Sequence, residues 1–168
     1  MKRPLIPLAG LVLAGLLGAT AAQAQTAAPA APPVPQYGSN ISHELARKTL
    51  SAAIAEARKQ SLPMAVAVVD TAGQLVAFER MDNTQTASTA IAQDKAVSAA
   101  MYRRPSKVFQ DLVAGGGVGL RVLTLRGAIA VEGGLPITVD GKIVGAIGVS
   151  GGSSEQDGVI AKAGLDAK

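Results

Sequence analysis

A serine flanked by glycines lies near the C-terminal end of the chain, in the stretch GVSGG from Gly148 to Gly152. This stretch fits the G-x-S-x-G pattern of a hydrolase nucleophile elbow. A nucleophilic serine needs a base to take its proton, and that base is nearly always a histidine. The single histidine, His43, precedes Ser150, whereas in elbow hydrolases the histidine follows the serine. The sequence therefore argues against a nucleophilic serine, and the glycines need another explanation.

The sequence also does not match the other glycine-rich motifs or the metal-binding motifs that it could contain. Gly141-Lys142 is followed by Ile143 instead of Ser or Thr, and Pro136 stands where a Walker loop has its first glycine. A dinucleotide fingerprint would need a βαβ unit, which the pattern around these glycines does not predict. Zinc would need several His or Cys ligands, but the chain has one histidine and no cysteine. The absence of cysteine also excludes disulfides and c-type haem attachment.

The remaining side chains with useful chemistry lie on two expected helices. His43 opens the first helix, where it could be a ligand or an ordinary residue of a helix start. Asp94 and Lys95 lie on the second helix and could simply be surface groups. The pair Arg103 and Arg104, at the end of that helix, is interpreted as solvated rather than anion-binding.

The first 40 residues are expected to lie outside the folded domain. Residues 1–24 have a positive start, an apolar run and an A-x-A site at Ala22–Ala24, which is the arrangement of a cleaved signal peptide. The sequence predicts cleavage before Gln25 and export to the periplasm or the outside of a bacterium, with no transmembrane segment in the remainder. An uncleaved anchor helix is the alternative. Residues 25–40 are rich in alanine and proline and predict a mobile tether, so the domain is expected over residues 41–168.

The first half of the domain predicts a helix followed by a hairpin. Ser42 is a suitable N-cap for a helix with apolar residues every three or four positions, and Pro63 ends that segment. Two runs of strand length follow, Met64–Val69 and Gln74–Arg80. Between them Gly73 can take a positive φ, so an antiparallel hairpin is expected.

The middle of the chain predicts two helices and a weak strand. Helical spacing returns over residues 86–103, and Pro105 can occupy the first turn of a short helix that ends at Gly115. Residues Val122–Val131 form a weaker strand candidate, which Arg126-Gly127 interrupts.

The C-terminal part predicts a second hairpin and a last helix. Strands over residues 135–139 and 142–149 flank Asp140-Gly141, the strongest short hairpin signal. Ser153-Ser154-Glu155-Gln156 supplies an N-cap and a capping-box Gln for a helix over residues 155–167, so the glycines of GVSGG are expected to form a tight strand-to-helix junction. The order α-β-β-α-α-β-β-β-α predicts an α+β domain whose antiparallel sheet is flanked by helices.

The composition of the chain limits the classes of molecule that it is expected to bind. The formal net charge is +4, but Lys2 and Arg3 belong to the expected signal peptide. Aromatic residues make up 2% of the chain, so the stacking platforms that bind single-stranded nucleic acid are missing. Nucleic acid is therefore not an expected partner, and these residues alone predict an exported domain with a small ligand.

Three stretches resemble the GlcG/HbpS-type haem-binding family, also called the haem-degrading domain family. They are Glu79-Arg80-Met81-Asp82, Asp94-Lys95-Ala96 and GGLPITVDGKIVGAIGVSGGSSEQD from Gly133 to Asp157. The family includes the C-terminal domain of some corrinoid adenosyltransferases, and the likeness runs from about Ser42 to Asp166. It implies a profilin-like α+β fold, symmetric tetramers or octamers, and a non-covalent b-type haem. Exported relatives are linked to haem sensing or iron handling.

The resemblance also implies candidate site residues. His43 is the expected iron ligand because it is the only imidazole, and Met81 and Tyr102 are the other side chains able to bind iron. A second group could meet the haem propionates: Lys95, Arg103 and Arg104. An enzyme or accessory factor in haem, glycolate-type or corrinoid-type metabolism is the alternative, as is an apo oligomeric scaffold. The lack of an acid–base pair with a matching nucleophile favours binding over turnover.

Overall fold

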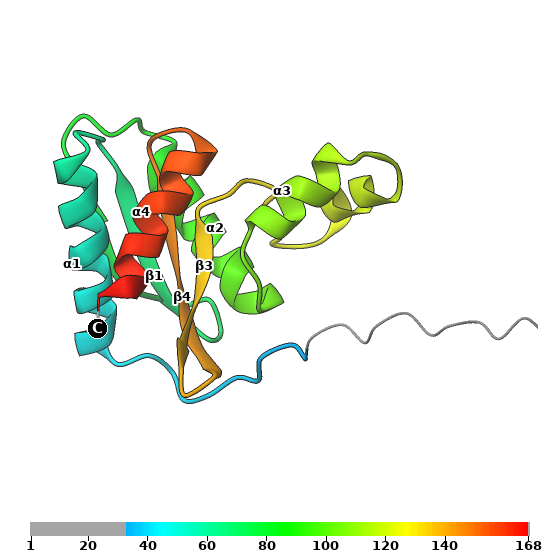
Figure 1. Ribbon diagram of the computed structural model, residues 1–168, viewed down its shortest axis with the longest axis horizontal. Coiled ribbons are helices and arrows are strands. Elements are labelled where there is room, and N and C mark those ends of the chain that lie inside the picture. The colour runs from blue at the N-terminus through cyan, green and yellow to red at the C-terminus, as the bar shows by residue number, and fades with distance from the viewer. Residues whose placement is uncertain (1–32, 168) are drawn as a thin grey trace, which may run out of the picture. The chain divides into compact units, whose positions relative to one another are not determined.

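A four-stranded antiparallel sheet, in the order β2-β1-β4-β3, organises the part of the chain that the computed structural model describes, residues 33–167 (Figure 1). Its strands are β1 (Ala65–Asp70), β2 (Leu75–Arg80), β3 (Gly134–Val139) and β4 (Lys142–Ser150). The two expected hairpins are β1–β2 and β3–β4, and β1 pairs with β4 between them. The α+β class is confirmed. The expected signal peptide and residues 25–32 of the expected tether lie outside the described residues.

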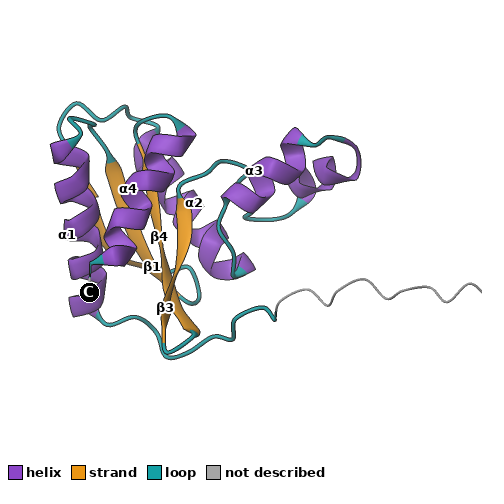
Figure 2. Ribbon diagram, viewed as in Figure 1, coloured by secondary structure: helices purple, strands orange, loops and turns teal. Residues whose placement is uncertain are grey.

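Helices cover both faces of the sheet (Figure 2). One face packs against α1 (His43–Lys59) and α4 (Ser154–Asp166), and the other packs against α2 (Ser88–Tyr102). Strand residues alternate between these layers because successive side chains point to opposite faces. On β1, Val66 and Val68 belong to the α1–α4 core, whereas Ala67 belongs to the core under α2.

Small residues bring α2 close to the sheet. The core between them contains four alanines of the helix: Ala92, Ala96, Ala99 and Ala100. A Cβ atom built on Gly148 of β4 would lie 2.0 Å from the carbonyl oxygen of Ala92. This close approach explains how the domain of a chain with 2% aromatic residues can fill its interior.

The β3–β4 hairpin has the turn that its sequence predicts. Asp140 and Gly141 both have positive φ angles, 51° and 74°. Two such residues are the requirement of a type I′ turn, whose twist matches that of the flanking strands.

One expected element has a different conformation. Residues Val122–Val131, a weak strand candidate, instead form the end of a 3₁₀ helix, η1 (Gly117–Thr124), and an irregular return segment. Gly127 has φ 75°, which turns the chain at the point where the apolar run is interrupted. Together with α3 (Lys107–Ala114), η1 extends away from the sheet, and residues 107–125 are called the arm below (Figure 1).

The last residues of the expected tether are attached to the domain. The N–H of Ile143 donates to the oxygen of Gln36, and the N–H of Gly38 donates to the oxygen of Ile143, each at 2.8 Å. The Tyr37 hydroxyl donates to the Ala100 oxygen at 2.8 Å, at the end of α2. Residues 36–41, called the N-terminal clip below, thus cross the end of the sheet and lead into α1.

Candidate functional site

Ser150 is buried and has a structural partner. Its Oγ donates to the Oγ of Ser88 at 3.1 Å, in the interior between β4 and α2. His43, the only possible imidazole base, is exposed at the first residue of α1 and makes no hydrogen bond to this serine. The elbow-like sequence is therefore not a nucleophile site.

The glycines after the serine allow this turn to lie close to the segment that leads into β1. Gly151 has φ 156°, and a Cβ atom there would lie 2.3 Å from the oxygen of Pro63. Gly152 donates its N–H to Oδ1 of Asp157 at 3.0 Å. The expected capping box is present at Ser153. The connection from β4 to α4 therefore consists of Gly151, Gly152 and this N-cap residue.

Lys95 and Asp157 form a buried ion pair, with Nζ 2.6 Å from Oδ2. The two side chains are only 1% and 4% exposed. In a single copy the Lys95 ammonium group is enclosed and already paired, so it is not free to contact the propionate that the resemblance implied. A Cβ atom on Gly133 would lie 3.0 Å from the Lys95 Nζ, so this glycine makes room for the pair.

Burial raises the pKa of the Asp157 carboxyl above its ordinary value, although Lys95 and the N–H of Gly152 act in the opposite direction. Sequence reasoning missed Asp157 as a partner. The available signal was Lys95 itself, which lies among the alanines that α2 buries. A lysine in such a position requires an acidic partner.

His43 offers an accessible imidazole. Its apolar stripe continues through Ala46 and Leu50, which are buried, but the first turn of the helix is exposed to solvent. Ser42 caps this turn by accepting a hydrogen bond from the N–H of Leu45 at 3.2 Å. The histidine backbone is thus fixed while its ring remains available to a ligand.

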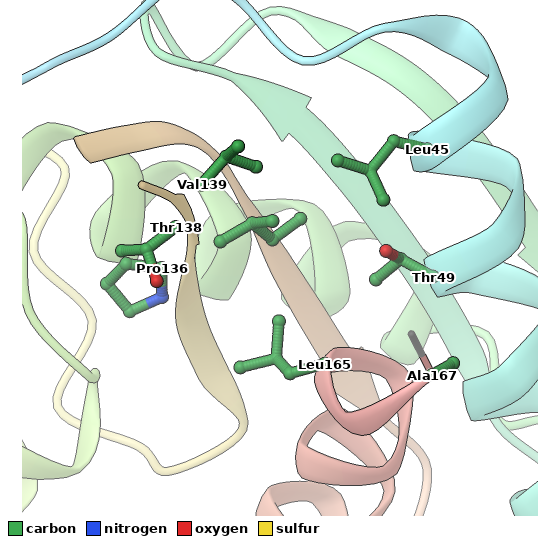
Figure 3. Close-up of a pocket in the computed structure, with 8 residues that line it drawn as sticks. Leu45, Thr49, Pro136, Thr138, Val139, Leu165 and Ala167 are labelled. Atoms are coloured by element: carbon green, nitrogen blue, oxygen red, sulfur yellow. The ribbon is translucent and has the colours of Figure 1, made fainter. Parts of the chain in front are cut away.

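A largely apolar groove is lined in part by α1, although His43 is not among its lining residues. It has a volume of about 220 Å³ and lies between α1, β3 and the end of α4 (Figure 3). We call it the α1–β3 groove, and its lining is Leu45, Thr49, Pro136, Ile137, Thr138, Val139, Leu165 and Ala167. Sequence reasoning did not predict this groove, because its side chains come from three distant segments.

Met81 lies far from His43. It lines a polar hollow together with Arg58, near the C-terminal end of α1, whereas His43 begins that helix. With a rise of about 1.5 Å per residue, the fifteen steps from residue 43 to residue 58 span roughly 22 Å. In a single copy, therefore, Met81 and His43 do not approach the same iron atom.

The end of α2 carries the other candidates. Tyr102 donates its hydroxyl to the oxygen of Arg126 at 2.8 Å, so this group is already engaged. The Arg103 guanidinium lies over the ring of Tyr37, 5.4 Å from its centre. The Arg104 guanidinium lies over another aromatic ring in the same way. Within residues 33–167 neither arginine has an ion-pair partner, so both can receive an anionic group.

In the described part of the chain, no three His, Asp or Glu side chains are grouped closely enough to hold a metal ion. The helices of residues 33–167 include none that is long and apolar enough to cross a bilayer. The useful groups that remain are an exposed imidazole at the start of α1, an apolar groove between α1 and β3, and two arginines at the end of α2.

Comparison with known proteins gives one consistent family. The family model described as haem degrading protein HbpS-like matches residues 41–166. Protein GlcG of Escherichia coli (strain K12) is 37% identical over 110 residues, which cover 66% of this chain and 81% of GlcG.

Solved structures agree with that match. The structure of a PduOC:Heme complex has a TM-score of 0.70 and 28% identity, covering 77% of this chain and 95% of the other. A double mutant of HbpS from Streptomyces reticuli has a TM-score of 0.70 and 30% identity, covering 82% and 97%. One of these similar structures therefore contains haem.

Proposed function

Because this chain belongs to the HbpS-like family, we propose that it is an exported haem-binding protein that acts in haem or iron sensing or handling. Two findings support haem as the ligand: the family is described as haem-degrading, and the PduOC relative was solved with haem. The structural observations that carry the proposal are the exposed imidazole of His43 at the start of α1 and an apolar groove that the same helix helps to line. With no cysteine in the chain, a b-type, non-covalent haem fits better than a thioether-linked one.

The residues fit haem as a partly open site. A neutral imidazole is a good iron ligand, and His43 would serve as one. Leu45, Val139 and Leu165 can contact a porphyrin edge from the α1–β3 groove. Because binding pockets for ligands of drug size have volumes of about 300–1,000 Å³, the groove of about 220 Å³ encloses only part of such a group. We therefore propose that a second copy completes the enclosure.

The remaining candidates have smaller roles in this proposal. Arg103 and Arg104 would bind propionates, as cations without an acidic partner in residues 33–167. Met81 and Tyr102 are alternative iron ligands only if His43 is not used. Bound haem would supply a redox-active iron, and the chain itself would position the porphyrin and limit its contact with water.

The test is a titration of the purified protein with haemin, followed by absorption spectroscopy. The wild type is expected to sharpen and shift the Soret band, because an imidazole replaces a weaker ligand on the iron. His43→Ala should weaken or shift that band. Glu44→Ala, a neighbouring exposed change, is the control and should behave as the wild type.

Two other outcomes are informative. An unchanged Soret band with the wild type would refute haem binding. A wild-type spectrum with His43→Ala would instead assign the iron to another ligand, which Met81→Leu and Tyr102→Phe would then distinguish.

Haem degradation is the second candidate function, because the family description names it. The same haem-loaded sample tests it after addition of a reductant and oxygen. Turnover requires the Soret band to disappear faster than it does with free haemin. A rate equal to that of free haemin would leave binding as the function.

We also propose that the protein assembles into a tetramer or octamer. Many large apolar side chains are exposed on the described part of the chain, which favours contact with further copies. Light scattering at micromolar concentration is expected to give a mass that is four or eight times that of one chain. A monomer at that concentration would contradict this part of the proposal.

A further inference from the structure

The arm exposes an unusual amount of apolar surface for so short a segment. Val118 is 75% exposed and Leu123 is 67% exposed. Four further apolar side chains of the arm are also exposed: Val108, Leu112, Leu120 and Leu125. Scattered exposed apolar residues are normal, but a group of six within one segment indicates an interaction surface.

The arm is held firmly at its base. Ser106 Oγ donates to the oxygen of Val131 at 2.7 Å and accepts from the N–H of Gly134 at 2.9 Å. Gln110 Oε1 accepts from the N–H of Glu132 at 2.9 Å. The arm is therefore fixed at its base, and its backbone extends away from the sheet (Figure 1).

A second exposed apolar surface lies beside α2, on the face of the sheet against which this helix packs. Four strands about 4.8 Å apart need roughly two helices of about 10 Å diameter to cover them, but α2 is the single helix that packs on this face in residues 33–167. It covers β4, β1 and β3, and β2 lies beyond it at the sheet edge. On β2, Leu75 is 51% exposed, and it pairs with Val69 of the α2-side core. Phe78 and Val97 are only partly buried beside it.

This surface, which we call the α2–β2 face, consists of Leu75, Phe78, Asp94 and Val97. A hollow of about 260 Å³ adjoins it, lined by Asp94 and Val97 together with residues 127–129. Asp94 is exposed and has no ion-pair partner within the described residues. On the arm, Arg121 is likewise exposed and unpaired within residues 33–167, so the two surfaces complement each other in charge.

We propose that the arm of one copy packs against the α2–β2 face of a second copy, with Arg121 facing Asp94. The arm supplies the missing cover of the sheet, and burial of Leu75 and Leu123 removes apolar surface from water. Every copy carries both surfaces, so the exchange can be reciprocal about a two-fold axis. This inference rests on the self-assembly proposed above and is independent of haem.

Cross-linking tests the contact directly, since the chain has no cysteine of its own. Leu123→Cys and Leu75→Cys are prepared separately, mixed, and treated with a short bis-maleimide. The expected main product joins residue 123 of one copy to residue 75 of another. Val159→Cys, on the exposed side of α4, is the control and should give little product with residue 123. Equal products with residues 75 and 159 would overturn the inference.

Mass measurements separate this inference from the proposal of assembly. Leu123→Asp should reduce the oligomer mass, whereas Val159→Asp should leave it unchanged. Arg121→Asp and Asp94→Arg should each weaken association by about tenfold or more, and the double variant should recover most of that loss. An oligomer that keeps its mass with Leu123→Asp contradicts the arm contact alone. A monomeric wild type contradicts assembly itself.

Discussion

At the scale of single residues, a strict steric requirement lies where β4 meets α4. Ser150 and Gly151 are neighbours there, yet their side-chain positions face different surroundings. The serine hydroxyl has one hydrogen-bond partner in the interior, whereas the position of a Cβ on the glycine is already occupied by the backbone of Pro63 and Met64.

Gly151→Val is expected to lower the free energy of unfolding by about 1–3 kcal/mol, because a β-branched residue there needs the backbone to move. Ser150→Ala should cost no more than about 1.5 kcal/mol, the value of one hydrogen bond. Urea unfolding of both variants measures the difference. A glycine variant as stable as the wild type would mean that the junction is looser than the structure shows.

Removal of one partner of the buried pair of Lys95 and Asp157 is expected to change that free energy more. Lys95→Met is expected to cost about 3–5 kcal/mol, since it leaves a carboxylate buried without its cation. The double variant Lys95→Met with Asp157→Leu should recover much of this loss, because both charges are then removed. Thermal unfolding of the single and double variants checks the order of stability, and a double variant as unstable as the single one would contradict it.

The pH dependence of this pair has a defined sign. The pKa of Asp157 is raised in the folded protein, so the folded chain binds the proton more tightly than the unfolded chain. The contribution of Asp157 is therefore full below about pH 3.9, the ordinary value, and is lost as the pH rises through the raised pKa. Relative to the double variant, the wild type should become less stable as the pH rises from about 4 toward neutral. A constant difference over that range would argue against a raised pKa.

The sequence predicted the chemistry of single residues better than it predicted their positions in the fold. The argument against a nucleophilic Ser150 needed only the order of residues in the chain, and it agrees with the burial of this serine and its hydrogen bond to Ser88. The position of Lys95 was not predicted, since its partner Asp157 is 62 residues away. His43 was expected on a stripe that continues into the core, but the first turn of α1 lies beyond the buried part of that stripe.

At the scale of elements, α4 depends on its N-terminal cap. Ser153 accepts a hydrogen bond from the N–H of Gln156, and the Gln156 side chain accepts one from the N–H of Ser153. Ser153→Ala should lower the free energy of unfolding by about 0.5–2 kcal/mol. Ser154→Ala, one residue later and outside the cap, is the control and should have a smaller effect in the same urea titration.

Most elements were predicted correctly because local signals and packing agree in them. The Asp140-Gly141 pair determines its own hairpin, and Ser42 and Ser153 each begin a helix. Residues Val122–Val131 are the exception. Their apolar content suggested a strand, but Val122 is the single residue of η1 that is buried, and the run has no neighbouring strand to pair with. The groove beside β3 could not be predicted at all, because it depends on how α1 and α4 are placed.

At the scale of the whole molecule, the remaining expectation concerns residues outside the described part. If residues 1–24 are a signal peptide, the intact mass of the exported protein should correspond to a chain that begins at Gln25. Mass spectrometry of periplasmic or secreted material provides this value. A mass that includes residues 1–24 would favour the uncleaved anchor helix instead.

The N-terminal clip also makes the cooperative unit larger than the segment that the family model matches, residues 41–166. The N–H groups of Gly38 and Ile143 bond across the clip and should exchange with deuterium at a common rate, because one opening exposes both. A chain that starts at Ile41 lacks the partners of Ile143 and the tyrosine bonded to the end of α2. In such a chain, exchange at the start of β4 should accelerate while the centre of the sheet remains protected.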